Sequence, residues 1–271
     1  MRLAIGIDVG WSPRRRSCGL AVRGPVSVTR GRQFGAHTSV GLFTLDELVD
    51  ELERLARLHA DPVRNAILVI DGPVGPGIEA EPRRAIDGLF ACGGFSRRAP
   101  AYRITEGSGL ELSKATGRIL RALSERVPVQ PWLGGPIPNA GLVVAETNPT
   151  PAMALLLPQQ EIDSLPSRAR PKRIEDTVVA AKSDWYWRLG AGRYAARVLG
   201  HEGIANERNH ERVAALFALA LATVMADADT ASPPICALGD KDGVYVVPSD
   251  IDESWMQDVQ RVGIAHGTPR P

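Results

Sequence analysis

Three short apolar runs, each ending in an acidic residue followed by turn-forming residues, constrain this chain most. The runs are residues 3–10 (LAIGIDVG), 67–73 (ILVIDGP) and 142–149 (LVVAETNP). Short runs rich in β-branched residues are typical of strands that are buried on both faces, as in parallel sheets. The carboxyl ends of parallel strands meet at one edge of a sheet, where α/β proteins bind ligands. We therefore expect the acids that end these runs, Asp8, Asp71 and Glu146, to meet at that edge.

The order of the remaining patterns predicts a single α/β domain over residues 1–271. The predicted elements are strands over 3–9, 18–22 and 26–30, a helix over 44–59, a strand over 66–71, helices over 82–90 and 108–123, a strand over 141–146, helices over 151–157, 175–199 and 206–226, and an edge strand over 243–248. Short, turn-rich links between the first three strands are typical of an antiparallel meander. Glycine and proline interrupt residues 72–140 repeatedly, so we expect an irregular insertion between the fourth and fifth strands. The expected fold is a mixed central sheet flanked by helices.

The late helix over 206–226 is predicted to be buried between layers, because beyond Arg212 it is almost wholly apolar. Positions 211, 214, 215, 218 and 222 share one helix face, and all but the first are alanine. Small side chains let a helix lie close to a sheet, which would bring Glu211 near the strand ends as a fourth acid. His210 is a candidate general base or water-positioning group, although a histidine at a helix edge is more often a packing residue.

Carboxylates gathered at one edge repel one another, so their pairing costs free energy unless cations neutralise them. Oxygen ligands suit Mg²⁺ or Mn²⁺, and two such ions about 3.5 to 4 Å apart can activate water and stabilise a leaving oxygen in phosphodiester hydrolysis. Each acid also has an ordinary use, since an aspartate before glycine closes strands and Glu211 favours a helix dipole. The coincidence of several acids favours a Mg²⁺ or Mn²⁺ site at Asp8, Asp71, Glu146 and Glu211.

Five arginines are candidates for contacts with nucleic acid. Arg14, Arg15 and Arg16 follow the first strand, and Arg97 and Arg98 lie in the insertion. Arginines near a metal site would bind phosphates and make binding salt-dependent, although a solvated loop explains them equally well. The formal net charge is only +1, so nucleic acid would have to be held by a local patch of this kind.

At these motifs the chain resembles a known family. A β-β-β-α-β-α-β order with an acid ending the first and fourth strands is similar to the ribonuclease H-like fold. Within that fold, the segments similar to the domain-of-unknown-function 429 family, which are predicted nucleases, are residues 5–8, 69–73, 84–87, 145–149 and 210–211 followed by an alanine-rich helix. The resemblance spans about residues 3–226 and implies that Asp8, Asp71, Glu146 and Glu211 face a metal. The family pattern has a second acid where this chain has Ala214, so the number of metal ions stays open.

Two other functions stay open beside the nuclease. Residues 5–10 are also similar to the first phosphate loop of the sugar-kinase and heat-shock ATPases, in which Gly10 and Ser12 would approach ATP phosphates and Asp71 would be a catalytic base. No second Asp-x-Gly strand turn and no clear adenosine loop accompany that motif in the sequence. The other alternative is a non-catalytic interaction module with a degraded site, which the alanine at position 214 makes credible.

Cysteine usage and hydropathy predict the cellular setting. Cys18, Cys92 and Cys236 are widely spaced without a Cys-x-x-Cys pair, which favours a reducing compartment and no thiolate zinc site. The histidines show no His-Glu-x-x-His pattern. The first apolar run ends at Asp8, too short for a signal-peptide core, and no run approaches the roughly 18 apolar residues of a membrane helix. We expect a cytoplasmic protein with no membrane partner, and the oligomeric state stays open, a homodimer included.

Overall fold

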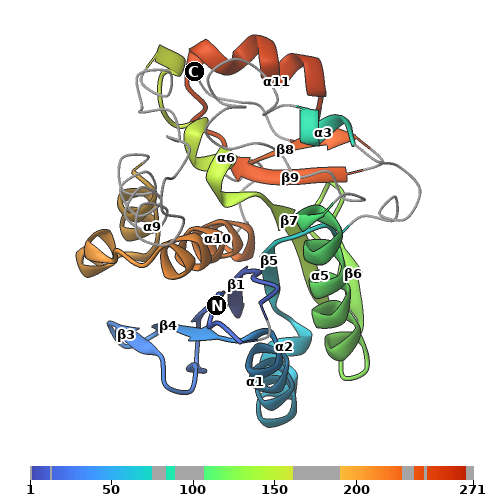
Figure 1. Ribbon diagram of the computed structural model, residues 1–271, viewed down its shortest axis with the longest axis vertical. Coiled ribbons are helices and arrows are strands. Elements are labelled where there is room, and N and C mark those ends of the chain that lie inside the picture. Colours follow the sequence, from blue (N-terminus) through green and yellow to red (C-terminus); the bar gives the residue numbers. More distant parts are fainter. Residues whose placement is uncertain are drawn as a thin grey trace.

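The computed structural model of this protein contains a mixed β-sheet with helices on both faces (Figure 1). It describes residues 2–12, 14–74, 84–88, 107–160, 190–227, 235–240 and 243–266. Within these ranges the strands are β1 (Ala4–Asp8), β2 (Cys18–Arg23), β3 (Arg32–Phe34), β4 (Thr38–Phe43), β5 (Ile67–Asp71), β6 (Val129–Pro131), β7 (Leu142–Thr147), β8 (Ile235–Asp240), β9 (Gly243–Pro248) and β10 (Ile264–His266). The predicted α/β class and mixed sheet are confirmed.

Strand β1 lies in the interior of the sheet, between β5 and β2. The strand order is β10-β8-β9-β7-β5-β1-β2-β4-β3, with β6 pairing β7 off this path. On one side β1, β2 and β4 are antiparallel neighbours, which agrees with the predicted antiparallel pairing of the first two strands. On the other side β1, β5 and β7 run parallel, so their carboxyl ends lie at the same edge. The three apolar runs therefore form the adjacent strands that their sequences predict.

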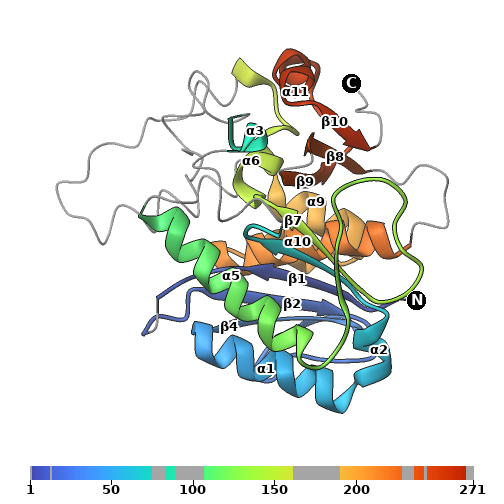
Figure 2. The same cartoon turned by 90° about the vertical axis from the view of Figure 1, so that its right-hand side faces the viewer.

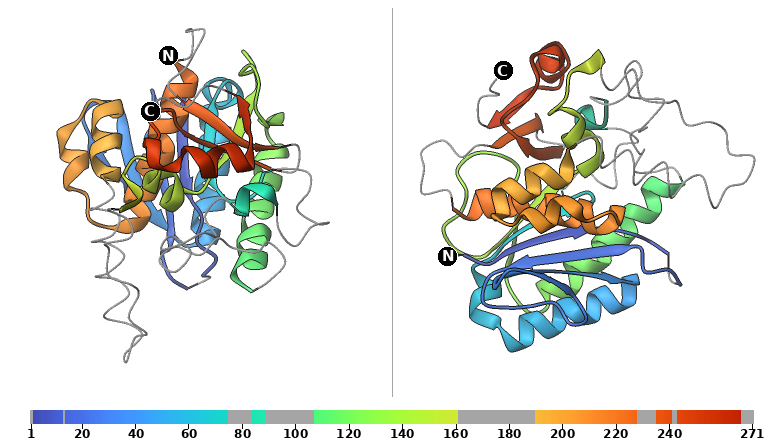
Figure 3. Two further views of the ribbon diagram at one scale, coloured as in Figure 1. Left: turned by 90° about the horizontal axis from the view of Figure 1, so that it is seen from above. Right: turned by 90° about the vertical axis from the view of Figure 1, so that its left-hand side faces the viewer.

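Helices cover both faces of the sheet (Figures 2 and 3). The described helices are α1 (Leu45–Leu58), α2 (Ala60–Arg64), α3 (Ala85–Gly88), α5 (Ser108–Ser124), α6 (Pro149–Ala154), α9 (Ala191–Leu199), α10 (His210–Ala226) and α11 (Met256–Val262), with short 3-10 turns over Glu202–Asn206 and Glu253–Trp255. One hydrophobic core lies between α1, α5 and the sheet, and a second surrounds α10. Helix α10 lies between the sheet and α9, as its apolar sequence predicts, because every side chain from Val213 to Thr223 is buried.

Local sequence signals explain where α1 begins. The Thr44 hydroxyl accepts a hydrogen bond from the Glu47 amide at 3.2 Å, and Glu47 Oε2 accepts one from the Thr44 amide at 2.9 Å. This reciprocal capping box satisfies two amides that the first helical turn leaves without partners. The sequence predicts this helix start correctly.

The predicted third strand over residues 26–30 is wrong. In this segment Arg30 has a φ of 55° and the Gly31 amide donates to the Val28 carbonyl at 3.3 Å, which makes a tight turn. The strand that pairs with β2 is β4, and its pattern is hidden by Gly41. A Cβ at Gly41 would lie 2.6 Å from the Phe43 ring, so the ring fills the space that a larger residue would need.

The predicted edge strand over 243–248 is present as β9, but it does not lie at the edge. It pairs with β7 on one side and β8 on the other. Strands β8 and β10 were not predicted, because neither short segment shows a clear alternation. The helices expected over 82–90 and 175–199 fall partly outside the described residues, which show α3 and α9 in these regions.

Candidate carboxylate site at the carboxyl ends of β1, β5 and β7

The last residues of β1 and β5 form a pair of carboxyl groups. Asp8 and Asp71 are register partners in the parallel pairing of these strands, and their side chains share a hydrogen bond. Asp8 is 9% exposed and Asp71 is partly buried. Because two carboxyl groups can share a hydrogen bond only when one of them is protonated, this pair holds a proton or needs a cation in its place.

The alternation of side chains along the strands separates Glu146 from this pair. In β1 and β5, the residues an even number of positions before Asp8 and Asp71 pack in the core around α10. In β7, Leu142 and Val144 pack in the core beneath α5. Glu146 lies two positions after Val144, so it follows the same alternation as Leu142 and Val144. It is the register partner of Ile70, and the residue that pairs with Asp71 is Thr147. A one-residue difference in register therefore separates Glu146 from the aspartate pair, although Asp71 and Glu146 still line one pocket at the strand ends.

The Glu146 carboxylate is bound by an arginine from the segment before α3. Arg84 Nη2 donates to Glu146 Oε1 and Arg84 Nη1 donates to Oε2, both at 2.7 Å. Both residues are only 3% exposed. The Val74 amide also donates to Oε2, at 3.2 Å. Glu146, which we expected as a metal-facing acid, is thus satisfied by protein donors at both oxygen atoms.

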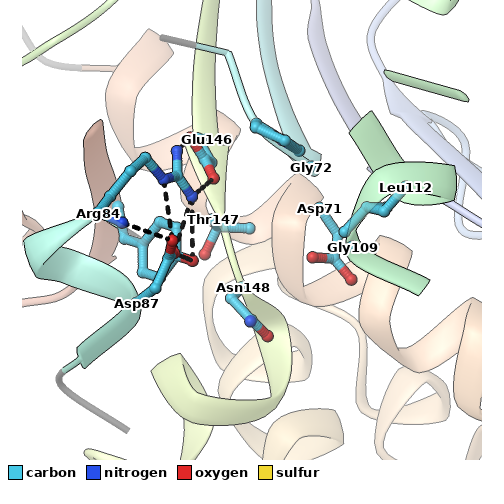
Figure 4. Close-up of a pocket in the computed structure, with 11 residues that line it drawn as sticks. Asp71, Gly72, Arg84, Asp87, Gly109, Leu112, Glu146, Thr147 and Asn148 are labelled. Carbon is cyan, nitrogen blue, oxygen red and sulfur yellow. Dashed lines mark hydrogen bonds and ion pairs between the residues drawn. The ribbon is translucent and has the colours of Figure 1, made fainter. Parts of the chain in front are cut away.

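Two further buried side chains hold Arg84 in place (Figure 4). Arg84 Nη2 lies 2.9 Å from Asp87 Oδ1, three residues further along the chain. The Tyr245 hydroxyl donates to Asp87 Oδ1 at 2.7 Å and accepts from Arg84 Nη2 at 3.3 Å. We call these four residues, Arg84, Asp87, Glu146 and Tyr245, the Arg84 cluster.

A small pocket lies beside the Arg84 cluster. Its volume is about 20 Å³, enough for one water-sized group. The lining residues are Asp71, Gly72, Pro73, Arg84, Asp87, Gly109, Leu112, Glu146, Thr147, Asn148 and Tyr245. In Figure 4 Asp71 lies on one side of this pocket and the Arg84 cluster lies on the other. The pocket therefore adjoins one member of the aspartate pair.

Burial and neighbouring charge shift the protonation equilibria of these acids. Burial and the charge of Glu146 raise the pKa of Asp71 to about 7, although the hydrogen bond from Asp8 opposes this shift. Burial also raises the pKa of Glu146, against the lowering effect of Arg84. Burial lowers the pKa of Arg84, but Glu146 and the other cluster members raise it by more, so the guanidinium stays charged. The carboxyl group of Asp71 therefore gains or loses a proton near neutral pH.

Helix α10 brings Glu211 to the same edge of the sheet. A Cβ at Gly6 would lie 2.2 Å from the Leu219 amide nitrogen, and a Cβ at Gly19 would lie 2.3 Å from the Glu211 carbonyl oxygen. The helix can approach β1 and β2 this closely only because both strand residues are glycine. Gly19 is the register partner of Asp8, so the start of α10 lies beside the aspartate pair. This is the close packing that the alanine face predicts.

The start of α10 is fixed by polar groups. Asn209 Oδ1 accepts from the Arg212 amide at 3.0 Å, which caps the helix. His210 Nε2 lies 2.8 Å from Glu211 Oε1, and both side chains are largely buried. The two α10 residues that the sequence suggests for catalysis therefore contact each other. Their roles as a base and a metal ligand remain predictions.

The arginine loop after β1 lies at this edge because it follows Asp8 directly. Arg14, Arg15 and Arg16 are exposed, and Trp11 in the same loop is 38% exposed. Arg16 Nη2 forms an ion pair with Glu47 Oε1 at 2.8 Å, so part of its charge is neutralised. Arg97 and Arg98 lie outside the described residues.

The donor set of the aspartate pair fits a divalent cation of the Mg²⁺ type. Within the described ranges no group of three or more histidine, cysteine, aspartate or glutamate residues is arranged to hold a metal ion. Mg²⁺, however, commonly binds through one or two carboxylates and keeps several water molecules. Asp8 and Asp71 supply such a pair.

Sequence reasoning missed the partners of Glu146. Arg84 and Asp87 were visible as a pair at helical spacing, but nothing in the sequence linked them to a strand 60 residues later or to Tyr245. The only signal was the cost of placing a glutamate at the end of a buried strand, which requires a compensating cation. That cation is an arginine of the same chain.

In the parts of the chain that the structure describes, no helix combines the length and the apolar character needed to cross a membrane. Comparison of the chain with protein-family models, with curated proteins and with solved structures found no match in any of the three. The resemblance to predicted nucleases therefore rests on the sequence motifs alone.

Proposed function

We propose that this protein is a divalent-metal-dependent hydrolase with a ribonuclease H-like fold that cleaves phosphodiester bonds in nucleic acid. The observation that carries the proposal is the pairing of Asp8 and Asp71 on adjacent parallel strands, with a hydrogen bond between their carboxyl groups. Two ionised carboxylates this close repel each other, and a bound cation would remove this repulsion.

The topology supports this assignment. An interior first strand, antiparallel strands on one side and parallel strands on the other agree with the ribonuclease H-like arrangement that the motifs imply. The approach of α10 to β1 and β2 at two glycines adds a further acid, Glu211, near the end of β1. These features come from segments distant in sequence, so their convergence is a property of the fold.

We assign separate roles in this reaction to the residues at the carboxyl ends of β1 and β5. Asp8 and Asp71 would hold the ion, whose bound state supplies an activated water molecule and stabilises the leaving oxygen. The pKa of Asp71 is raised to about 7 in the protein alone, so the ion would compete with a proton for this pair at physiological pH. Arg14 and Arg15 would bind backbone phosphates, because they are exposed in the loop that follows Asp8.

The test compares Asp8→Asn and Asp71→Asn with the parent on branched and single-stranded DNA and RNA in Mg²⁺ or Mn²⁺. Asp50→Asn, which removes an exposed acid from α1, is the matched control. We expect cleavage by the parent and the control, abolition by a chelator, and a loss of at least about 100-fold in either aspartate variant. Equal activity in all variants, or no cleavage of any substrate by the parent, would contradict the proposal.

A second candidate is a non-catalytic module that keeps the fold with a degraded site. It is favoured by the commitment of Glu146 to Arg84 and by the alanine at position 214. Binding of nucleic acid by the parent without cleavage in either metal would support it. The ATPase alternative gains less support, because the Ser12 hydroxyl accepts a hydrogen bond from the Arg15 amide within its own loop. Micromolar binding of ATP with Mg²⁺, measured by calorimetry, would favour that alternative.

A further inference from the structure

We propose that Arg84 is a built-in cation that neutralises Glu146, so that the site binds a single divalent ion, at Asp8 and Asp71. This inference rests on the proposed metal-dependent function. It assigns Arg84 and Glu146 a positioning role and removes Glu146 from the set of metal ligands. The juxtaposition that carries it is a buried, bidentate arginine on the one strand-end acid that lies out of register with the other two.

Both carboxylate oxygen atoms of Glu146 already accept hydrogen bonds from the protein. Oε1 accepts from Arg84 Nη2, and Oε2 accepts from Arg84 Nη1 and from the Val74 amide. A metal ion at Glu146 would have to displace at least one of these buried donors. The displaced guanidinium would then lose charge-assisted hydrogen bonds of the strongest kind found in proteins.

Further contacts hold the Arg84 side chain in place. Its Nε lies 3.2 Å from Asp87 Oδ2, and its Nη2 also contacts Asp87 Oδ1 and the Tyr245 hydroxyl. Strand β9 packs against the stem, because a Cβ at Gly243 would lie 2.8 Å from Arg84 Cδ. The guanidinium is therefore clamped between two carboxylates, and it cannot move aside to admit a second ion without disrupting the Arg84 cluster.

The register of the strands also separates Glu146 from Asp8 and Asp71. The register offsets Glu146 by one residue from the level of Asp8 and Asp71, although Asp71 and Glu146 both line the pocket at the strand ends. An ion held by the aspartate pair therefore has Thr147, rather than Glu146, as the next residue across the sheet. Register and ion pairing, which are independent observations, lead to the same assignment.

One divalent ion then balances the charge of the aspartate pair. The fixed guanidinium offsets one of the two negative charges in the Arg84 cluster, while one divalent ion offsets both aspartates. A second divalent ion would need a further acid on α10, and the residue one turn after Glu211 is Ala214. The permanent charge of Arg84 also reduces the negative potential that a phosphodiester meets at the pocket.

The experiment is a calorimetric titration of the metal-free full chain with Mn²⁺ alone. We expect the parent to bind one Mn²⁺, and Glu146→Gln to bind one Mn²⁺ with an affinity changed by less than about tenfold, because only a longer-range charge is removed. Asp8→Asn and Asp71→Asn should weaken binding by at least about 100-fold, since each removes a ligand. Glu51→Gln, which removes a buried glutamate paired with Arg54 elsewhere, is the matched control and should behave as the parent does.

Circular dichroism and thermal unfolding establish that each variant is folded. If Glu146→Gln does not fold, the Arg84→Met, Glu146→Gln double variant, which removes both charges together, takes its place. Two Mn²⁺ ions in the parent, or loss of binding in a folded Glu146 variant, would overturn this inference while leaving a metal-dependent function intact. No Mn²⁺ binding by the parent would contradict the proposed function as well.

Discussion

Asp8 and Asp71 are register partners at the ends of two parallel strands, and their carboxyl groups share a hydrogen bond. This relationship places two acidic side chains side by side at the ends of adjacent strands. A fold retains such an arrangement at a cost in stability, which a bound cation would remove. The predictions below follow from this pair and from the elements that position it.

The stability of the metal-free protein should fall as pH rises. The pKa of Asp71 is raised from 3.8 to about 7 in the folded chain, so the folded state binds more protons than the unfolded state between these values. The free energy of unfolding therefore decreases across this range, and the stabilising contribution is fully present only below it. Urea unfolding at pH values between about 4.5 and 8 measures the slope, which Asp71→Asn should reduce and Asp50→Asn should retain. Mg²⁺ should stabilise the parent more at the upper end of this range.

The close contact between α10 and the sheet should not tolerate a side chain at Gly6. A Cβ there would lie 2.2 Å from the Leu219 amide nitrogen and 2.3 Å from the Ala215 carbonyl oxygen, so the helix backbone would have to move. We expect Gly6→Ala to lower the free energy of unfolding by about 1 to 3 kcal/mol or more. Gly117→Ala is the control, because a Cβ on this exposed face of α5 meets nothing within 4 Å. That control should stabilise the protein by up to about 1 kcal/mol.

Removing Arg84 alone should lower the free energy of unfolding far more than removing Arg84 together with the charge of Glu146. Arg84→Met leaves Glu146 and Asp87 buried without their cation, which we expect to cost about 3 to 5 kcal/mol of unfolding free energy. Adding Glu146→Gln should recover part of this loss. Lys114→Met, which breaks the exposed pair with Glu111, should cost less than about 1 kcal/mol. Equal losses in the Arg84 and Lys114 variants would show that the Arg84 cluster does not act as a buried ion pair.

The loop after β1 should contribute to nucleic-acid binding. Replacing Arg14 and Arg15 with alanine should weaken binding of single-stranded DNA and reduce the slope of log affinity against log salt by about 1.5, because two phosphate contacts are lost. Fluorescence anisotropy at several salt concentrations measures both quantities. The matched control replaces Arg57 and Arg64, which are also exposed but lie on α1 and α2. A salt slope that changes equally in both double variants would exclude a specific role for the loop.

The central strands and α10 could be predicted from the sequence because their signals are local. Apolar runs with an acid and a glycine turn mark β1 and β5, and an unbroken apolar stretch marks α10. These elements also bring Asp8, Asp71 and the start of α10 together, since parallel pairing aligns the strand ends. The predicted third strand failed where the local signal was misleading, because a turn at Arg30 and Gly31 ends the extended segment early.

The assignment of Glu146 could not be decided from the sequence. Whether a strand-end side chain lies on one face or the other depends on a register difference of one residue, which is set by pairing with β5. Its partner Arg84 comes from a segment 62 residues earlier, and Tyr245 lies 99 residues later. Such contacts depend on the tertiary packing of α3 and β9 and leave no pattern in β7 itself.

The most direct test of the proposed metal site is a crystal of the parent protein soaked in Mn²⁺ and measured near the manganese absorption edge. We expect one anomalous peak about 2 Å from carboxylate oxygens of Asp8 and Asp71, with the Arg84–Glu146 contacts unchanged. A peak at Glu146 with Arg84 displaced, or no peak beside the aspartate pair at a saturating concentration of Mn²⁺, would contradict it.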